Sequence, residues 1–279
     1  MKLSWLQTVM MGLVSGLSEP LPVSAEAHRG LLRQFFGVSS EEPLLVLMCH
    51  LASLIVLLMS GHLELKRLRR TGKLLRTPPR RRTGHPDLNS AGTIKLLRPA
   101  ALLTVIGRML SVHFSGVADK LYLLFPALIL GGLILWLPTH FRTGNKDGRH
   151  LAPVDGTLMG VGAALSALPG VSLVGAAASV GSIRCADRRY VLRFSWILMT
   201  ISLGTAAAID LLTIAGTGFS FALEQLLRAV LAGGCSALGT YLSVQLMLAL
   251  MRRGGKGISG FSYYNWGLAL LCLVLFLLV

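Results

Sequence analysis

Charged residues are scarce in this sequence, and acidic residues are the scarcest. Only 14% of the 279 residues are charged, and 12 Asp and Glu stand against 27 Lys and Arg. Soluble domains usually carry about 25% charged residues, so this composition excludes an ordinary soluble enzyme. The net charge of +15 lies mostly in loops beside apolar runs, as the positive-inside rule produces. We therefore expect no nucleic-acid partner.

Cysteine is also rare. The four cysteines are scattered, mostly within apolar stretches, at Cys49, Cys185, Cys235 and Cys272. Their spacing predicts neither a disulfide framework nor a cysteine metal site. The apolar N-terminal run has no small-residue cleavage site before its prolines, so we expect no cleaved signal peptide.

Long hydrophobic runs are what the sequence has in abundance, because 53% of its residues are hydrophobic. Runs of this length and polarity predict membrane-spanning helices. The fold class expected is an all-α polytopic membrane protein with a single domain over 1–279. Six spans are predicted, at about 44–60, 96–114, 121–138, 190–214, 226–251 and 261–279.

Two further apolar segments, about 4–36 and 153–185, are interrupted by proline and glycine at "EPLPVS" and "LPGVS". Short spans broken at matching positions predict re-entrant hairpins that form a binding site. The echo of "LPVS" in "LPGVS" supports their equivalence. We expect each segment to enter and leave the membrane on one side.

Basic loops predict the orientation of the chain. The stretch 66–82 carries nine Lys and Arg residues within a basic loop of about 61–95, and we expect it to be cytoplasmic and flexible near anionic headgroups. Alternation places 139–152, 184–193 and 252–260 on the same side. The two hairpins then enter from opposite sides, so repeats of about 1–140 and 150–279 have inverted topology.

Polar side chains gather at the first break. Glu19 precedes Pro22, and Ser24, Glu26 and His28 follow it. Ionisable residues at membrane depth indicate function, and a helix beginning near Ser24 would direct its N-terminal amides toward an anion such as phosphate. Ser24 and His28, four residues apart, could act as nucleophile and base or hold a phosphate. The carboxylates could hold a divalent cation.

These residues also have structural interpretations. Ser24 could be a plain helix N-cap, His28 an interfacial residue at a helix end, and Glu26 a side chain facing water in an outer vestibule. His50, inside a predicted span, is interpreted as an interhelical hydrogen-bond partner. The residues alone leave both sets of interpretations open.

The stretch "SGLSEPLPVSAEAH" resembles the first motif of the undecaprenyl-pyrophosphate phosphatase family of the bacitracin-resistance type, E-G-x-x-E-F-L-P-V-S-S-x-G-H. The stretch "LPGVSLVGAAASVGSIRCADRRYVLRFSWIL" resembles its second motif, P-G-x-S-R-S-G, followed by a basic loop. The similarity covers essentially the whole chain in length, element order and motif spacing. It implies six spans and two re-entrant hairpins in an inverted repeat, which the basic loops also predict.

The resemblance implies hydrolysis of undecaprenyl diphosphate to the monophosphate, which recycles the lipid carrier of cell-wall synthesis. It implies a bacterial cytoplasmic-membrane protein whose site faces the outer side. It assigns catalytic roles to Glu19, Ser24 and His28, with Glu19 also binding a divalent cation, Mg or Ca. The residues expected to bind substrate are Gly170, Ser172, Gly175 and Glu26. The partners implied are a long-chain isoprenyl diphosphate and the bilayer, and a homodimer is allowed.

Several motif positions depart from the family pattern, namely Ser15, Ala25, Ala27, Leu173 and Val174. Leu173 stands where the motif has an arginine that would hold phosphate in a bidentate contact, which leucine cannot do. Arg29 or Arg184 could restore the positive charge. The sequence thus favours a phosphatase of this family with a degenerate motif. The alternative is a polyprenyl-phosphate binder or flippase of the same fold that performs no catalysis.

Overall fold

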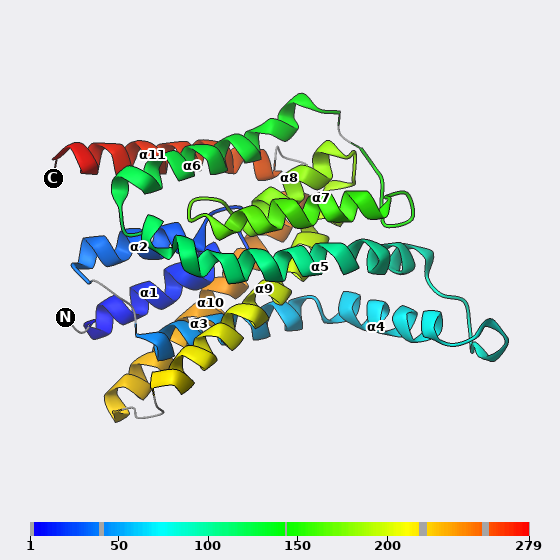
Figure 1. Ribbon diagram of the computed structural model, residues 1–279, viewed down its shortest axis with the longest axis horizontal. Helices are drawn as coiled ribbons and strands as arrows, with labels where there is room; N and C mark the ends of the chain where they lie inside the picture. Colours follow the sequence, from blue (N-terminus) through cyan, green and yellow to red (C-terminus); the bar gives the residue numbers. More distant parts are fainter. Residues whose placement is uncertain (1–2, 39–41, 143, 218–221, 253–256, 279) are drawn as a thin grey trace.

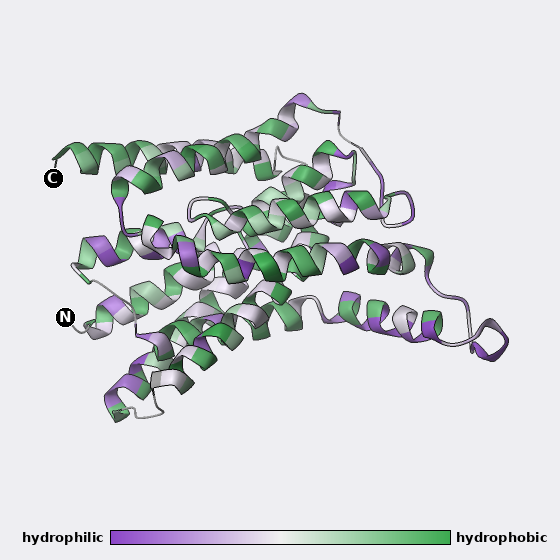
Figure 2. Ribbon diagram, viewed as in Figure 1, coloured by the Kyte–Doolittle hydropathy of each residue, from purple (hydrophilic) through white to green (hydrophobic). Residues whose placement is uncertain are grey.

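The computed structural model describes residues 3–38, 42–142, 144–217, 222–252 and 257–278. Within these ranges the chain is helical apart from its turns and one isolated β-bridge between Lys146 and Ala186. Six helical stretches are long and apolar enough to cross a membrane, which confirms the predicted spans. They belong to α3 (Pro43–Ser60), α5 (Leu88–Phe114), α6 (Leu121–Trp136), α9 (Arg188–Thr217), α10 (Leu223–Arg252) and α11 (Gly260–Leu278). Figure 2 shows hydrophobic residues dominating these helices.

The basic segment is more ordered than we expected from its composition. Residues expected to be flexible form α4 (His62–Arg76), an amphipathic helix, and α5 begins at Leu88, ahead of the predicted span. The physical reason is that Leu, Lys, Arg and Glu are all good helix formers. Leu68 and Thr71 are buried on the apolar face of α4, which packs along α5 (Figure 1).

The two broken segments form two pairs of short helices. The first pair is α1 (Trp5–Ser18) and α2 (Ala25–Phe36), and the second is α7 (Pro153–Ala164) and α8 (Leu173–Ile183). These helices contain 14, 12, 12 and 11 residues. At 1.5 Å per residue the longest reaches about 21 Å, short of the roughly 30 Å hydrocarbon core. Each pair therefore turns back part-way through the membrane.

The tips of the two pairs contact each other in a reciprocal way. Ser24 caps the N-terminus of α2 and its Oγ also accepts a hydrogen bond from the Gly170 amide at 2.9 Å. Ser172 caps the N-terminus of α8, and its Oγ donates to the Leu21 carbonyl at 3.2 Å. The carbonyl of Pro20, which the proline-rich turn leaves outside a helix, accepts from Trp196 Nε1 of α9 at 3.1 Å. Backbone groups at membrane depth are thus satisfied internally, as hydrocarbon requires.

Glycines on the first helix of each pair allow that helix to pack closely against a span of the other repeat. Helix α1 packs on α10, and α7 packs on α5. A Cβ at Gly16 would collide with the Ser236 carbonyl oxygen, and a Cβ at Gly156 would collide with that of Leu96. Small residues let membrane helices approach this closely. The exchange of partners between the two halves is the packing expected of a two-fold repeat.

The basic segments lie at one end of the molecule. Figure 1 places α4, the connection before α7 and the turn after α8 toward one end, and the start of α1, the turn at Ser115–Val117 and the end of α11 at the other. Because Lys and Arg are enriched on the cytoplasmic side of membrane proteins, we expect the first end to be cytoplasmic. The fold therefore has the two-sided charge distribution that the predicted orientation requires.

Cysteine labelling checks this orientation. In a variant whose four cysteines are replaced by alanine, Arg80→Cys should react with an impermeant maleimide only after the cells are opened. Gly116→Cys should react in intact cells, and a Cβ at Gly116 meets no atom within 4 Å, so this substitution fits the fold. Labelling of position 80 in intact cells would reverse the orientation.

Candidate active site

A small polar cavity lies where the tips of the two helix pairs meet α5 and α9. Four charged residues and five serines are among its lining residues. The charged ones are Glu19, Glu26, Arg29 and Arg108, and the serines include Ser24 and Ser172. Such a group of charges inside an apolar bundle is costly and indicates a functional site.

Ser24 is held in this cavity by two backbone donors. It is buried, and its Oγ accepts from the amide of Ala27 at 3.3 Å and from that of Gly170 at 2.9 Å. Two donors to one hydroxyl oxygen favour negative charge on that oxygen. The N-cap interpretation of Ser24 is therefore correct, and it is compatible with a chemical role.

The predicted residues of the second segment shape the opposite wall. Ser172 lines the cavity, and its Oγ accepts from the Gly175 amide at 3.1 Å. Gly170 has φ +111, and a Cβ there would lie 2.6 Å from the backbone carbon of Ala127, so only glycine fits. Neither glycine is among the lining residues. Their backbone amides instead donate to the two serines that line the cavity, Gly170 to Ser24 and Gly175 to Ser172.

Helix N-termini and a carboxylate border the same space. Ala25 and Leu173, the first residues of α2 and α8, both line the cavity. The partial positive charge of each helix N-terminus favours a bound anion such as phosphate. Glu19 follows the last residue of α1, is 7% exposed and lines the cavity.

A chain of polar contacts connects the cavity with α9. Arg29, 4% exposed, forms an ion pair with Glu26 and donates from Nη1 to His50 Nε2 at 3.2 Å. His50 Nδ1 in turn donates to Asp210 Oδ2 at 2.7 Å. These roles require a neutral His50 with its proton on Nδ1. The prediction that His50 is an interhelical partner is confirmed, and Glu26 lies in an ion pair at the cavity wall.

Arg108 of α5 brings a second guanidinium to the cavity. Its Nε is buried and makes no hydrogen bond within the described part of the chain. A buried polar group without a partner is rare in folded proteins. Arg108 thus brings a positive charge and an unpaired Nε–H donor to the cavity that Glu26 and the two helix N-termini also line.

His28 points away from this cavity. Its Nδ1 donates to the Ser24 carbonyl at 2.6 Å, and its Nε2 accepts from the Tyr264 hydroxyl of α11 at 2.6 Å. The two rings also stack, with centroids 5.7 Å apart. The structure therefore brings Glu19, Ser24, Glu26 and Ser172 together in the cavity, whereas His28 is not among its lining residues and contacts Ser24 only through the backbone.

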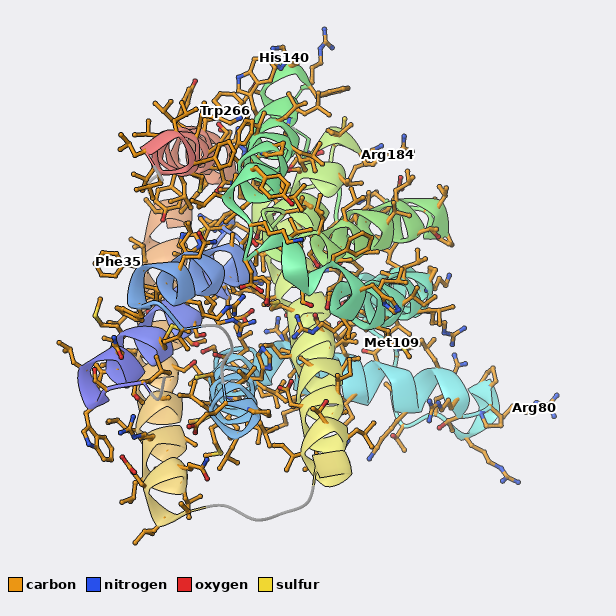
Figure 3. The ribbon with its side chains drawn as sticks, turned by 60° about the vertical axis from the view of Figure 1, so that its left-hand side comes forward. Phe35, Arg80, Met109, His140, Arg184 and Trp266 are labelled. Atoms are coloured by element: carbon orange, nitrogen blue, oxygen red, sulfur yellow. The ribbon has the colours of Figure 1, made fainter. Side chains whose placement is uncertain are left out.

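The sequence argument did not identify Arg108 or Asp210. Each is an ionisable residue inside a predicted apolar span, 96–114 or 190–214. An ionisable residue in such a position indicates a functional site, and this signal could have identified both. Of the two arginines proposed to restore a positive charge, Arg29 lies in the cavity. Arg184, labelled in Figure 3, follows the last residue of α8, does not line the cavity and pairs with Asp155.

The charges of the cavity balance without a ligand, because Glu19 and Glu26 oppose Arg29 and Arg108. A phosphate group carrying about −1.5 to −2 at pH 7 would add uncompensated negative charge. Mg²⁺ is commonly held by one or two carboxylates together with substrate phosphate oxygens. No group of three or more His, Cys, Asp or Glu gathers in the described ranges, and Glu26 is already held by Arg29. Glu19 is therefore the carboxylate of this cavity that is left to hold a cation together with substrate oxygens.

Comparison with known proteins identifies the family of this chain. The family model described as "Bacitracin resistance protein BacA" matches residues 8–271. A protein of Carboxydothermus hydrogenoformans named undecaprenyl-diphosphatase is 30% identical over 273 residues, covering 96% of each chain. Proteins with the same name from Methanobrevibacter smithii and Rubrobacter xylanophilus are 28% and 27% identical, covering 94% and 99% of this chain and 94% and 100% of their own. The chain belongs to the BacA family of bacitracin resistance proteins.

Proposed function

We propose that this multi-pass membrane protein is an undecaprenyl-diphosphate phosphatase, which hydrolyses a long-chain isoprenyl diphosphate to the monophosphate. The observation that carries the proposal is a single cavity containing a doubly hydrogen-bonded serine, two helix N-termini, two carboxylates and two arginines. Phosphoryl transfer depends mainly on positioning and charge neutralisation, and this cavity supplies both. The relatives that carry the name undecaprenyl-diphosphatase support the same substrate.

In the proposed reaction the terminal phosphate lies between the N-termini of α2 and α8. Arg108 and the amide ends of the two helices neutralise its charge. Ser24 Oγ attacks the terminal phosphorus, and the bond from that phosphorus to the bridging oxygen breaks, which releases the lipid monophosphate. Water then attacks the phosphoserine and releases inorganic phosphate. Glu19 takes the proton from the hydroxyl and passes it to the departing monophosphate oxygen. It then takes a proton from the water and returns it to Ser24 Oγ as inorganic phosphate leaves. Glu26 is not assigned this role, because it is engaged by Arg29.

A divalent cation bound by Glu19 would offset the charge of the phosphate oxygens. Glu19→Gln should therefore lower turnover and raise the Mg²⁺ concentration for half-maximal activity about tenfold, since one charged ligand worth about 1.5 kcal/mol is lost. Glu26→Gln is the matched control. It leaves the buried Arg29 without its ion-pair partner, so it should lower the melting temperature instead. Unchanged Mg²⁺ dependence in a folded Glu19→Gln protein contradicts the assignment.

His28 is proposed as a positioning residue, because it holds the Ser24 carbonyl and is itself held by Tyr264. His28→Ala should reduce kcat at least tenfold with little change in KM, since Ser24 loses its orientation and the phosphate contacts remain. Tyr264→Phe removes only the outer hydrogen bond and should show a smaller loss of the same kind. Full turnover in His28→Ala would remove His28 from the mechanism.

We further propose that the site faces the outer side of the cytoplasmic membrane. Arg108 lies in the last third of α5, near the end of the molecule opposite the basic segments. The start of α1 and the end of α2 also lie toward that end (Figure 1). A homodimer stays a prediction, which the mass of the purified protein in detergent would check.

The experiment that tests the function is phosphate release from undecaprenyl diphosphate by the purified protein, with Mg²⁺ or with EDTA. Ser195→Ala is a suitable control variant, because Ser195 is buried but donates only to the Val191 carbonyl within α9. Phosphate release that Ser195→Ala retains would support the proposal. Absence of release at every cation concentration would contradict it.

The second candidate is a polyprenyl-phosphate binder or flippase without hydrolytic activity. It is favoured by Leu173 and Val174, which are buried in the largest apolar core cluster at the N-terminus of α8. Lipid binding measured in the same preparation separates the two functions. Tight binding of the diphosphate lipid without phosphate release would establish this alternative.

A further inference from the structure

A second, larger cavity lies away from the catalytic one. Its volume is about 460 Å³, and it shares no lining residue with the first cavity. It is bordered by the end of α6, by the turn Leu137–His140, by α8 and by the beginnings of α9 and α11. His140 and Trp266 mark this region in Figure 3. The cavity therefore lies toward the basic end of the molecule, away from the proposed site of hydrolysis.

The lining of this second cavity is basic and aromatic. Arg142 and Arg188 line it beside His140, and none of its described lining residues is Asp or Glu. Trp136 and Tyr263 form part of its wall. Trp and Tyr are enriched where a membrane protein crosses the lipid–water interface. Charge and position together favour an anionic group at the depth of lipid headgroups.

A buried hydroxyl without a partner lies in the same wall. Ser179 of α8 is 1% exposed, and its Oγ makes no hydrogen bond within the described part of the chain. Ser182, one turn further along the same wall, instead donates to the Ala178 carbonyl. A buried hydroxyl left unpaired costs free energy unless a ligand supplies the partner. Ser179 is thus a second, independent sign that the cavity holds a ligand with an acceptor oxygen.

We propose that this cavity binds the phosphate headgroup of an anionic phospholipid from the cytoplasmic leaflet. Basic pockets between membrane helices on this side bind such headgroups. Arg142 and Arg188 would contact the phosphate oxygens, and the Ser179 hydroxyl would donate to one of them. A cavity of this size accommodates a headgroup. The acyl chains would lie along the exposed apolar faces of α6 and α11, where Leu133 and Leu271 are exposed.

Native mass spectrometry of the purified protein with phosphatidylglycerol or phosphatidylcholine tests the proposal. Phosphatidylglycerol should bind at least tenfold more tightly and raise the melting temperature. Arg142→Gln and Ser179→Ala should each reduce this preference by about tenfold or more. Arg80→Gln is the matched control, because Arg80 is an exposed arginine that does not line the cavity, and it should bind like the unmodified protein.

Three outcomes would overturn the proposal. One is equal binding of the two lipids, and another is an Arg142→Gln protein that binds like Arg80→Gln. The third is stabilisation by inorganic phosphate alone at the concentration that saturates with lipid, which would assign the cavity to a soluble anion. The proposal does not depend on hydrolysis, because every readout is lipid binding or stability.

Discussion

Arg108→Leu is expected to reduce kcat/KM for phosphate release by at least about 100-fold, the loss typical of removing one donor that stabilises transition-state charge. The melting temperature should fall as well, because Glu19 and Glu26 are then opposed by Arg29 alone in the cavity, so activity is compared in folded protein. Arg98→Leu is the matched control. Arg98 lies on the same helix with an exposed side chain and does not line the cavity, so its loss should leave activity intact.

Leu173→Arg offers a sharper version of this experiment. Leu173 lines the same cavity as Arg108 and begins α8, so an arginine there could reach the same phosphate. We expect Leu173→Arg to restore at least tenfold of the activity lost in Arg108→Leu, through a charge-assisted contact of about 1.5–3 kcal/mol. Leu173 is also buried in the apolar core, and an unpaired arginine there would destabilise the protein. Melting temperature is therefore measured with activity.

Two results would contradict the role of Arg108. The first is a folded Arg108→Leu protein with unchanged kcat/KM. The second is a folded double variant, with Leu173→Arg added, that gains neither diphosphate binding nor turnover. The second result would also favour the lipid-binding alternative. In an intact phosphate pocket, the guanidinium of the new arginine should strengthen binding of the diphosphate.

Ser24→Ala is expected to abolish turnover, with a loss of about 1,000-fold or more, because the proposed nucleophile is removed. Ser172→Ala is the matched control. Each substitution removes a helix N-cap, worth about 1 kcal/mol, and one contact between the tips, worth about 0.5–1.5 kcal/mol. The two variants should therefore lose similar stability. Ser172→Ala should lose only about tenfold in activity, since it alters one wall of the phosphate pocket.

The comparison of these two variants decides between a structural and a chemical role for Ser24. Equal losses of activity in both would show that Ser24 acts only as a cap and a link between the tips. A trapped phosphoprotein, detected by intact mass after rapid acid quenching, would identify Ser24 directly. Its absence in Ser24→Ala and presence in Ser172→Ala is the expected pattern.

The sequence by itself determined the six spans and the two broken helix pairs. Hydrophobic runs of bilayer length and proline-rich breaks are local properties, and the membrane imposes the same requirement on any such chain. The N-cap role of Ser24 was also predicted from local sequence, and the structure gives Ser172 the same role at the matching break. A further local signal went unused: Gly12 and Gly16 are spaced like Gly156 and Gly160, as close helix contacts require.

Only the tertiary structure decided which polar residues share the cavity. Arg108 of α5 and Glu26 of α2 line one cavity because α7 packs on α5 and the tip of the second helix pair contacts the tip of the first. His28 was predicted beside Ser24 on one face of α2, yet it contacts Tyr264, which is 236 residues away in the sequence. Helical spacing fixes which residues share a face, but which face meets the cavity depends on the helices that surround it. That choice is made by long-range packing, to which a single sequence gives no local signal.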